Sequence, residues 1–235
     1  GELIADSFKK KAMQIPYLRD LLLSDSIYIA SNITFNNLAP LSTYLGKPGN
    51  LEKGGLTFLE YMRRQEQHRK AEISALLDTP HFIDRAEELY QYDHFVCDSS
   101  GSICEVIDPR NPDDPVLNCL YKTTLLCWIE GTDLHRKELI ERFDRSPKPM
   151  YYEANFLKSK WTEYLAETGQ KEYQVDPDTF VRWTYDQALA HRQPRYAELS
   201  RWGVKVRADE IAAVKNENDF EDLIACALER GSQGV

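Results

Sequence analysis

Short apolar, β-forming runs alternate with amphipathic segments along this chain, and that alternation restricts its fold more than any other feature. Residues 26–33, 94–98 and 123–129 are β-forming runs and predict strands. Apolar positions at helical spacing predict helices over roughly 57–78 and 81–90. Strands and helices that alternate imply right-handed crossovers and a mostly parallel sheet. The sequence therefore predicts an α/β fold.

The run 123–129 is nearly all apolar, which is typical of a parallel strand that is covered on both faces. After it, the composition becomes helical and charged, and residues 133–143, 155–168 and 178–190 predict a helical cover. Residues 203–206 predict a short strand, followed by an amphipathic helix over 219–229. One face of that helix would carry Phe220, Leu223, Ile224 and Ala227.

Asp98 is the first candidate functional residue, because it ends an apolar run and is followed by the small residues Ser99 to Ser102. The carboxyl ends of parallel strands face the ligand crevice, where an aspartate can serve metal or phosphate chemistry. The alternative is an aspartate that only caps the next turn, since Asp and Ser are ordinary turn residues. A serine hydrolase is disfavoured, because no serine here has the flanking glycines of a nucleophile elbow.

Composition narrows the classes of partner. The formal net charge of −9 disfavours a general surface for duplex nucleic acid, although local arginines could still bind phosphate. No apolar run approaches the roughly 18 to 20 residues that a bilayer crossing needs, and the chain does not open with a signal peptide. We therefore expect a soluble, cytoplasmic protein.

Cysteines and histidines do not suggest a metal centre made by protein ligands alone. The five cysteines are widely spaced and lack a C-x-x-C pair, so they predict small buried apolar residues. The five histidines lack the spacing of metal ligands. The glycine-rich segment 46–55 contains lysines but lacks the spacing of a phosphate-binding loop, and it predicts a mobile surface loop.

The segment from Arg192 to Ser200 reads RQPRYAELS and precedes the strand and helix that close the chain. It resembles the carboxyl-terminal signature of shikimate-kinase-like P-loop kinases, in which an Arg-x-Pro-x-Tyr element opens a helix under the final strand. Together with Asp98, the layout is similar to that of uncharacterised bacterial proteins described as ATPases. The resemblance implies a three-layer α/β/α parallel sheet of the P-loop kinase type, as a single domain over 1–235 with a helical cover at about 133–192.

The resemblance also implies a magnesium-dependent enzyme that binds ATP. Asp98 would correspond to the second acidic motif and hold Mg²⁺, directly or through water. Arg192 and Arg195 would bind the nucleotide or the acceptor, because guanidinium groups form paired, charge-assisted hydrogen bonds with phosphate. Arg63 and Arg64 would line an acceptor site. The alternative for Arg192 and Arg195 is a solvated helix start. For Arg63 and Arg64, the alternative is that one of the two side chains points into solvent.

A Gly-x-x-x-x-Gly-Lys-Ser/Thr phosphate loop is absent from the 235 residues. In the family, this loop lies between the first strand and the first helix, and residues 1–13 have the pattern of that helix. We expect the first strand and the loop to precede Gly1 or to have diverged beyond recognition. The function expected is an ATP-dependent phosphotransferase or ATPase with an unknown small acceptor. The alternative is a non-catalytic α/β interaction module that has lost the loop.

Overall fold

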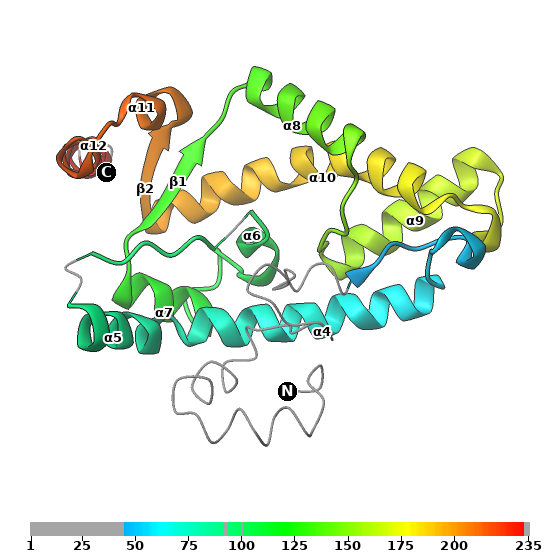
Figure 1. The fold of residues 1–235 in the computed structure, drawn as a ribbon, viewed down its shortest axis with the longest axis horizontal. Helices are drawn as coiled ribbons and strands as arrows, with labels where there is room; N and C mark the ends of the chain where they lie inside the picture. Colours follow the sequence, from blue (N-terminus) through cyan, green and yellow to red (C-terminus); the bar gives the residue numbers. More distant parts are fainter. Residues whose placement is uncertain (1–44, 92–93, 100, 233–235) are drawn as a thin grey trace. The chain divides into compact units, whose positions relative to one another are not determined.

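A computed structural model of the chain describes residues 45–91, 94–99 and 101–232 (Figure 1). This part is mixed α/β and mostly helical, with one two-stranded parallel sheet. The strand predicted over 26–33 and the helix predicted over 1–13 lie outside the described residues. The chain divides into two compact units. Unit 1 comprises residues 1–106 and 147–184, and unit 2 comprises residues 107–146 and 185–235.

Unit 1 is mainly helical in its described part, and the helices predicted over 57–78, 81–90 and 155–168 begin and end close to the predicted residues. The side chain of Thr57 accepts a hydrogen bond from the Glu60 N–H and so caps the longest helix of the unit. The elements are η2 (Leu51–Lys53), α4 (Phe58–Leu77), α5 (Thr79–Tyr90), α6 (Ile103–Val106), α9 (Ala154–Thr168), η3 (Glu172–Gln174) and the first residues of α10 (Pro177–Leu199).

Aromatic side chains from three helices form the core of unit 1. Phe180 of α10 is fully buried and packs edge-on against Trp161 and Tyr164 of α9. Trp161 also stacks on Phe58 of α4, with ring centroids 4.8 Å apart. Edge-to-face and offset aromatic pairs add to the stabilisation from burial. The same rings therefore hold α4, α9 and the start of α10 together.

The glycine-rich segment 46–55 is packed against unit 1, so the prediction of a mobile surface loop was wrong. Gly49 has a φ of 138°, and a Cβ at that position would lie 2.5 Å from the Val175 carbonyl oxygen. This close approach lets Asn50 donate a backbone hydrogen bond to the Val175 carbonyl. The lysines of the segment bind carboxylates at the start of α10: Lys47 pairs with Asp178 and Lys53 pairs with Asp176.

Asp176 provides a test of this packing through the pH dependence of stability. It accepts hydrogen bonds from the N–H and hydroxyl of Thr179, and these and Lys53 lower the pKa of its carboxyl group to about 2. Because the pKa is depressed in the folded state, the stabilisation is present above about pH 4 and is lost as the pH falls toward 2. We expect Asp176→Ala to lower the free energy of unfolding by about 1 kcal/mol at pH 7. Urea unfolding should show that the difference from wild type shrinks at pH 2.5; a constant difference would contradict the assignment.

Unit 2 contains the sheet and the helices that follow its two strands. Its elements are α7 (Pro115–Thr123), β1 (Leu126–Glu130), α8 (Asp133–Arg145), the remainder of α10, η4 (Ser200–Trp202), β2 (Gly203–Arg207), α11 (Ala208–Ala213) and α12 (Glu217–Ser232). The strands are parallel, and Leu126 pairs with Gly203 and Glu130 with Arg207. This confirms the two predicted strands and their parallel direction.

Each face of the sheet meets a helix. On one face, Val204 and Val206 of β2 are buried against Leu223, Ile224 and Ala227 of α12. These three belong to the apolar helix face that the spacing predicted, whereas its fourth member, Phe220, is 38 % exposed. Figure 1 shows α11 and α12 on the β2 side of the sheet. On the opposite face, Trp128 of β1 stacks on Tyr196 of α10.

The two faces of β1 are not equally covered, so the prediction of a strand buried on both faces was wrong. Cys127 and Ile129, which share the face of Val204 and Val206, are exposed. Apolar composition alone could not show this, because α12 packs mainly against β2.

Two further predictions are also wrong. Residues 94–98 form neither helix nor strand, and Val96 is 83 % exposed. Of the five cysteines, Cys104 is buried and Cys119 is half-buried, whereas Cys97, Cys127 and Cys226 are exposed. Both predictions relied on apolar neighbours in the sequence, and those neighbours are themselves partly exposed.

Candidate functional site

Asp98 belongs to the irregular segment between α5 and α6 of unit 1, and its side chain is exposed. Asp98 therefore does not lie at the carboxyl end of a buried strand. Its role as a magnesium ligand stays a prediction that depends on the resemblance alone.

Arg63 and Arg64 of α4 are both held by Glu60, one turn earlier on the same helix. Each guanidinium Nε lies 2.7 Å from a Glu60 carboxylate oxygen. Hydrogen bonds from Arg63 and then Arg64 lower the pKa of the partly exposed Glu60 carboxyl group to about 2. Ion pairs of this kind are common on helix surfaces, so the structure gives these arginines a local role. An acceptor site at Arg63 and Arg64 stays a prediction.

Arg192 lies within α10, which continues to Leu199, so the Arg-x-Pro-x-Tyr element does not open a helix as the resemblance implied. Arg192 is only 4 % exposed. Guanidinium groups are rarely buried to this extent, because removing their charge from water is costly unless other groups compensate. The reading of Arg192 as a solvated helix start is therefore wrong. Arg195, one turn later, is half-buried. The pKa of Glu198 is lowered mainly by its hydrogen bonds with Arg110, and the positive charge of Arg195 adds a smaller contribution.

Two contacts bring α8 against the part of α10 that carries Arg192. Phe143 of α8 stacks on Tyr185 of α10 with ring centroids 3.9 Å apart, and Arg136 forms an ion pair with Asp186. Burial raises the pKa of the Tyr185 phenol, while the positive charges of Arg192 and Arg142 oppose that rise. Two arginines from two helices therefore act on one tyrosine, and we call Arg142, Tyr185 and Arg192 the arginine cluster.

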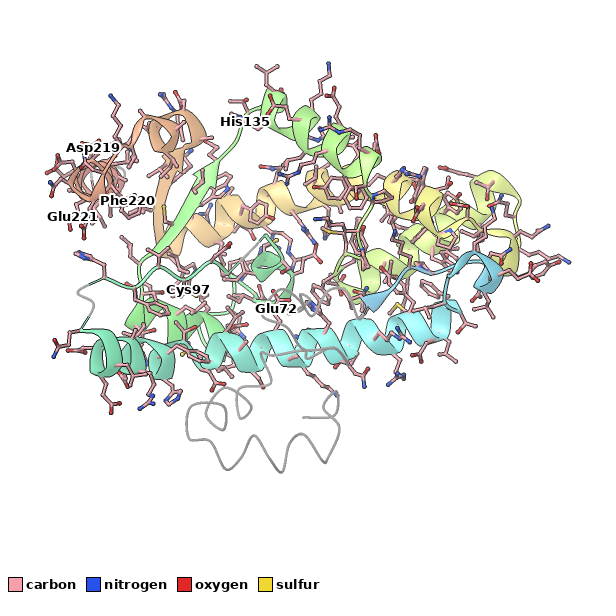
Figure 2. All side chains as sticks on the ribbon, in the orientation of Figure 1. Glu72, Cys97, His135, Asp219, Phe220 and Glu221 are labelled. Carbon is pink, nitrogen blue, oxygen red and sulfur yellow. The ribbon has the colours of Figure 1, made fainter. Side chains whose placement is uncertain are left out.

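A second polar group lies in unit 1 and was not singled out by sequence reasoning. The Ser102 hydroxyl, just before α6, donates to Glu72 Oε1 of α4 at 2.5 Å. The other oxygen, Glu72 Oε2, lies 3.4 Å from His68 Nδ1, one turn earlier on the helix. We call His68, Glu72 and Ser102 the His–Glu–Ser cluster; Glu72 is labelled in Figure 2.

His68 is held in place by its neighbours. Its ring stacks on Tyr151 with centroids 5.0 Å apart, and burial lowers the pKa of His68 to about 4, so the ring is neutral at pH 7. The segment that carries Tyr151 is fixed to α4 by Gln65, which donates to the Met150 carbonyl and accepts from the Tyr152 N–H, both at 3.0 Å. The spacing of His68 and Glu72 on a predicted helix was a usable signal, because residues four apart share a helix face.

Unit 2 also contains an open hollow of about 560 Å³ between α11 and α12. None of the candidate site residues named from the sequence lines this hollow. Its lining is mainly acidic and consists of Glu210, Asp219, Asp222, Leu223, Cys226, Glu229 and Arg230. Carboxylates repel phosphate, so this hollow is unsuited to a nucleotide.

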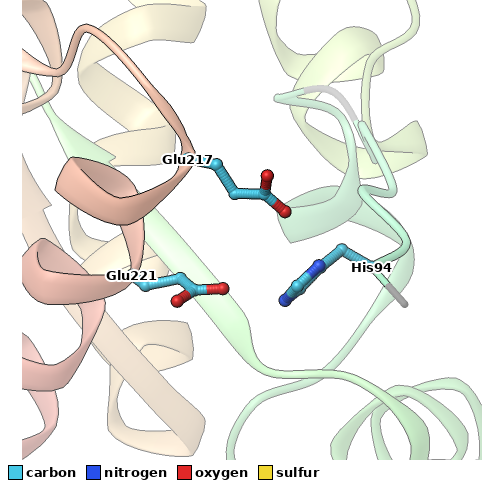
Figure 3. A group of neighbouring side chains, drawn as sticks. All are labelled: His94, Glu217 and Glu221. Atoms are coloured by element: carbon cyan, nitrogen blue, oxygen red, sulfur yellow. The ribbon is translucent and has the colours of Figure 1, made fainter. Parts of the chain in front are cut away.

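Glu217 and Glu221 project from the first turns of α12 in unit 2, and Figure 3 draws them with His94, which belongs to unit 1. All three side chains are exposed, and exposed acidic groups at helix spacing are ordinary surface features. We assign no site to these residues.

Comparisons with known proteins do not extend the assignment. No protein-family profile, curated protein or solved structure matches the chain. Within the described ranges, none of the helices combines the length and apolar character that a bilayer crossing requires.

Proposed function

We propose that this chain belongs to a nucleotide-binding phosphotransferase or ATPase of the P-loop kinase type, which acts with Mg²⁺ and ATP on a small acceptor. The proposal begins from the resemblance of the Arg192–Ser200 segment. The proposal includes a three-layer α/β/α fold, whose parallel sheet would contain more strands than the two described.

The architecture of unit 2 supports it. β1 and β2 are parallel, and each is followed within three residues by a helix, α8 after β1 and α11 after β2. Helices pack on both faces of the pair, with α12 on one face and α10 on the other. Parallel strands with helices on both faces are characteristic of α/β nucleotide-binding folds.

The arginine cluster is the observation that carries the proposal furthest. Arg192 is buried, and its positive charge and that of Arg142 both act on the phenol of Tyr185. Phosphoryl transfer is catalysed mainly by positioning and by stabilising negative charge, which two guanidinium groups on neighbouring helices can supply. Arg192 and Arg195 would hold the phosphates or an anionic acceptor, and Asp98 would hold the metal ion.

Calorimetric titration tests this function. ATP is titrated, with and without Mg²⁺, into the full-length protein, and release of inorganic phosphate is followed in parallel. We expect saturable binding at one site per chain, stronger with Mg²⁺. Absence of binding in that polypeptide contradicts the proposal.

The alternative function is a non-catalytic interaction module, and one observation favours it. Ile129 of β1 is 51 % exposed beside the exposed Cys127, so part of the sheet presents apolar side chains to solvent. Strand edges and apolar patches of this kind are used for partner binding. Lack of nucleotide binding together with a partner that protects β1 from hydrogen exchange would support this alternative.

A further inference from the structure

The His–Glu–Ser cluster has a geometry that its hydrogen bonds alone do not explain. Ser102 holds one oxygen of the Glu72 carboxylate at 2.5 Å, which directs the other oxygen toward His68. His68 Nδ1 is buried and makes no hydrogen bond within the described residues. The separation of 3.4 Å from Glu72 Oε2 is longer than the 2.7–3.2 Å of a normal N–H···O hydrogen bond.

The same separation suits two ligands of one metal ion. A tetrahedral Zn²⁺ takes His nitrogen and carboxylate oxygen at about 2.0–2.1 Å, so two such ligand atoms lie roughly 3.4 Å apart. The carboxylate of a metal ligand is commonly oriented by a hydrogen bond to its second oxygen, which is what Ser102 provides.

The charges around the cluster favour a cation. Three carboxyl groups, those of Glu105, Glu72 and Glu153, and one guanidinium group, that of Arg69, act on the phenol of Tyr151, which stacks on His68. Three carboxyl groups against one guanidinium give a negative local potential. Glu105 of α6 is only 4 % exposed, so solvent screens the contribution of its charge less than that of an exposed carboxylate.

We propose that His68 Nδ1 and Glu72 Oε2 are the protein ligands of a divalent transition-metal ion such as Zn²⁺, with Ser102 as the residue that positions Glu72. Water or a small ligand completes the coordination, so the ion is exchangeable. Nitrogen and oxygen donors of this kind suit first-row transition metals rather than Mg²⁺ or Ca²⁺. The site is separate from the arginine cluster and does not depend on the proposed function.

Zinc titration of the metal-free protein tests the site. We expect one Zn²⁺ per chain by calorimetry, and a visible absorption spectrum of bound Co²⁺ that Zn²⁺ displaces. His68→Gln should weaken Zn²⁺ binding more than tenfold, because it removes one of the two ligands. Ser102→Ala should weaken it about tenfold, as is usual when the group that orients a ligand is lost.

His81→Gln serves as the control, because it changes an exposed histidine of α5 in the same unit. It should bind Zn²⁺ within twofold of wild type. Ser102→Ala keeps both ligands and so tests the site even if His68→Gln does not fold. A Kd of 1 mM corresponds to a binding free energy of about −4 kcal/mol. If wild-type protein binds no Zn²⁺ at concentrations up to about 1 mM, the proposal is overturned. Equal binding by wild type and His68→Gln overturns it as well.

Discussion

Replacing Gly203 by alanine should separate β1 from β2 and destabilise unit 2 by at least about 3 kcal/mol, in the range of severe single substitutions. Gly203 begins β2 directly opposite Leu126 of β1. A Cβ built on Gly203 would lie 2.0 Å from the Leu126 carbonyl oxygen and 2.8 Å from the Leu126 carbonyl carbon. These are backbone atoms, so rotation of a side chain cannot relieve the overlap. The strands must move apart, and the burial of Val204 and Val206 under α12 is lost with the pairing.

Gly231→Ala is the matched control for this substitution. Gly231 lies in the last turn of α12, and a Cβ there would meet no atom within 4 Å. Alanine has a higher helix propensity than glycine, so this variant should be unchanged or more stable by up to about 1 kcal/mol. Urea unfolding followed by circular dichroism compares the two. A Gly203→Ala protein as stable as Gly231→Ala would show that β1 and β2 are not paired in solution.

Helices were predicted better than strands, for a physical reason. The apolar spacing that predicted helices over 57–78 and 133–143 reflects contacts within a single segment, and α4 and α8 occupy these residues. A strand also needs a partner that its own sequence does not specify. Residues 123–129 and 94–98 are similar in apolar character, yet β1 pairs with β2 and residues 94–98 form no ladder in the described part of the chain.

Burial was harder to predict than secondary structure. Arg192 carries no local signal that distinguishes it from Arg195, since both lie in the same polar stretch of α10. Arg192 is nevertheless buried, whereas Arg195 is half-buried, so the difference arises from packing that the local sequence does not show. The His–Glu–Ser cluster could be predicted from the sequence only in part. The spacing of His68 and Glu72 is visible in the sequence, whereas Ser102 joins them only through the position of α6.

Replacing Arg192 by alanine should weaken ATP binding by about 1.5 to 3 kcal/mol, the usual range for a lost hydrogen bond to a charged group. That is roughly a 10- to 150-fold rise in Kd. Arg192→Lys should recover only part of the affinity, because an ammonium group lacks the planar fork of a guanidinium. Calorimetric titration of Mg·ATP into each full-length variant measures the change in Kd.

Because Arg192 is buried, its truncation also risks unfolding unit 2, so the exposed member of the arginine cluster provides the independent test. Arg142→Ala removes a positive charge that acts on the same Tyr185, with little loss of buried contact. If the cluster binds phosphate, Arg142→Ala should weaken ATP binding at low salt and do so less as ionic strength rises, since exposed charges are screened. Arg201→Ala, an exposed arginine in η4, is the matched control and should change the binding free energy by less than about 0.5 kcal/mol. Equal affinities for Arg142→Ala, Arg201→Ala and wild type would mean that the cluster serves the packing of α8 on α10 and that the phosphates bind elsewhere.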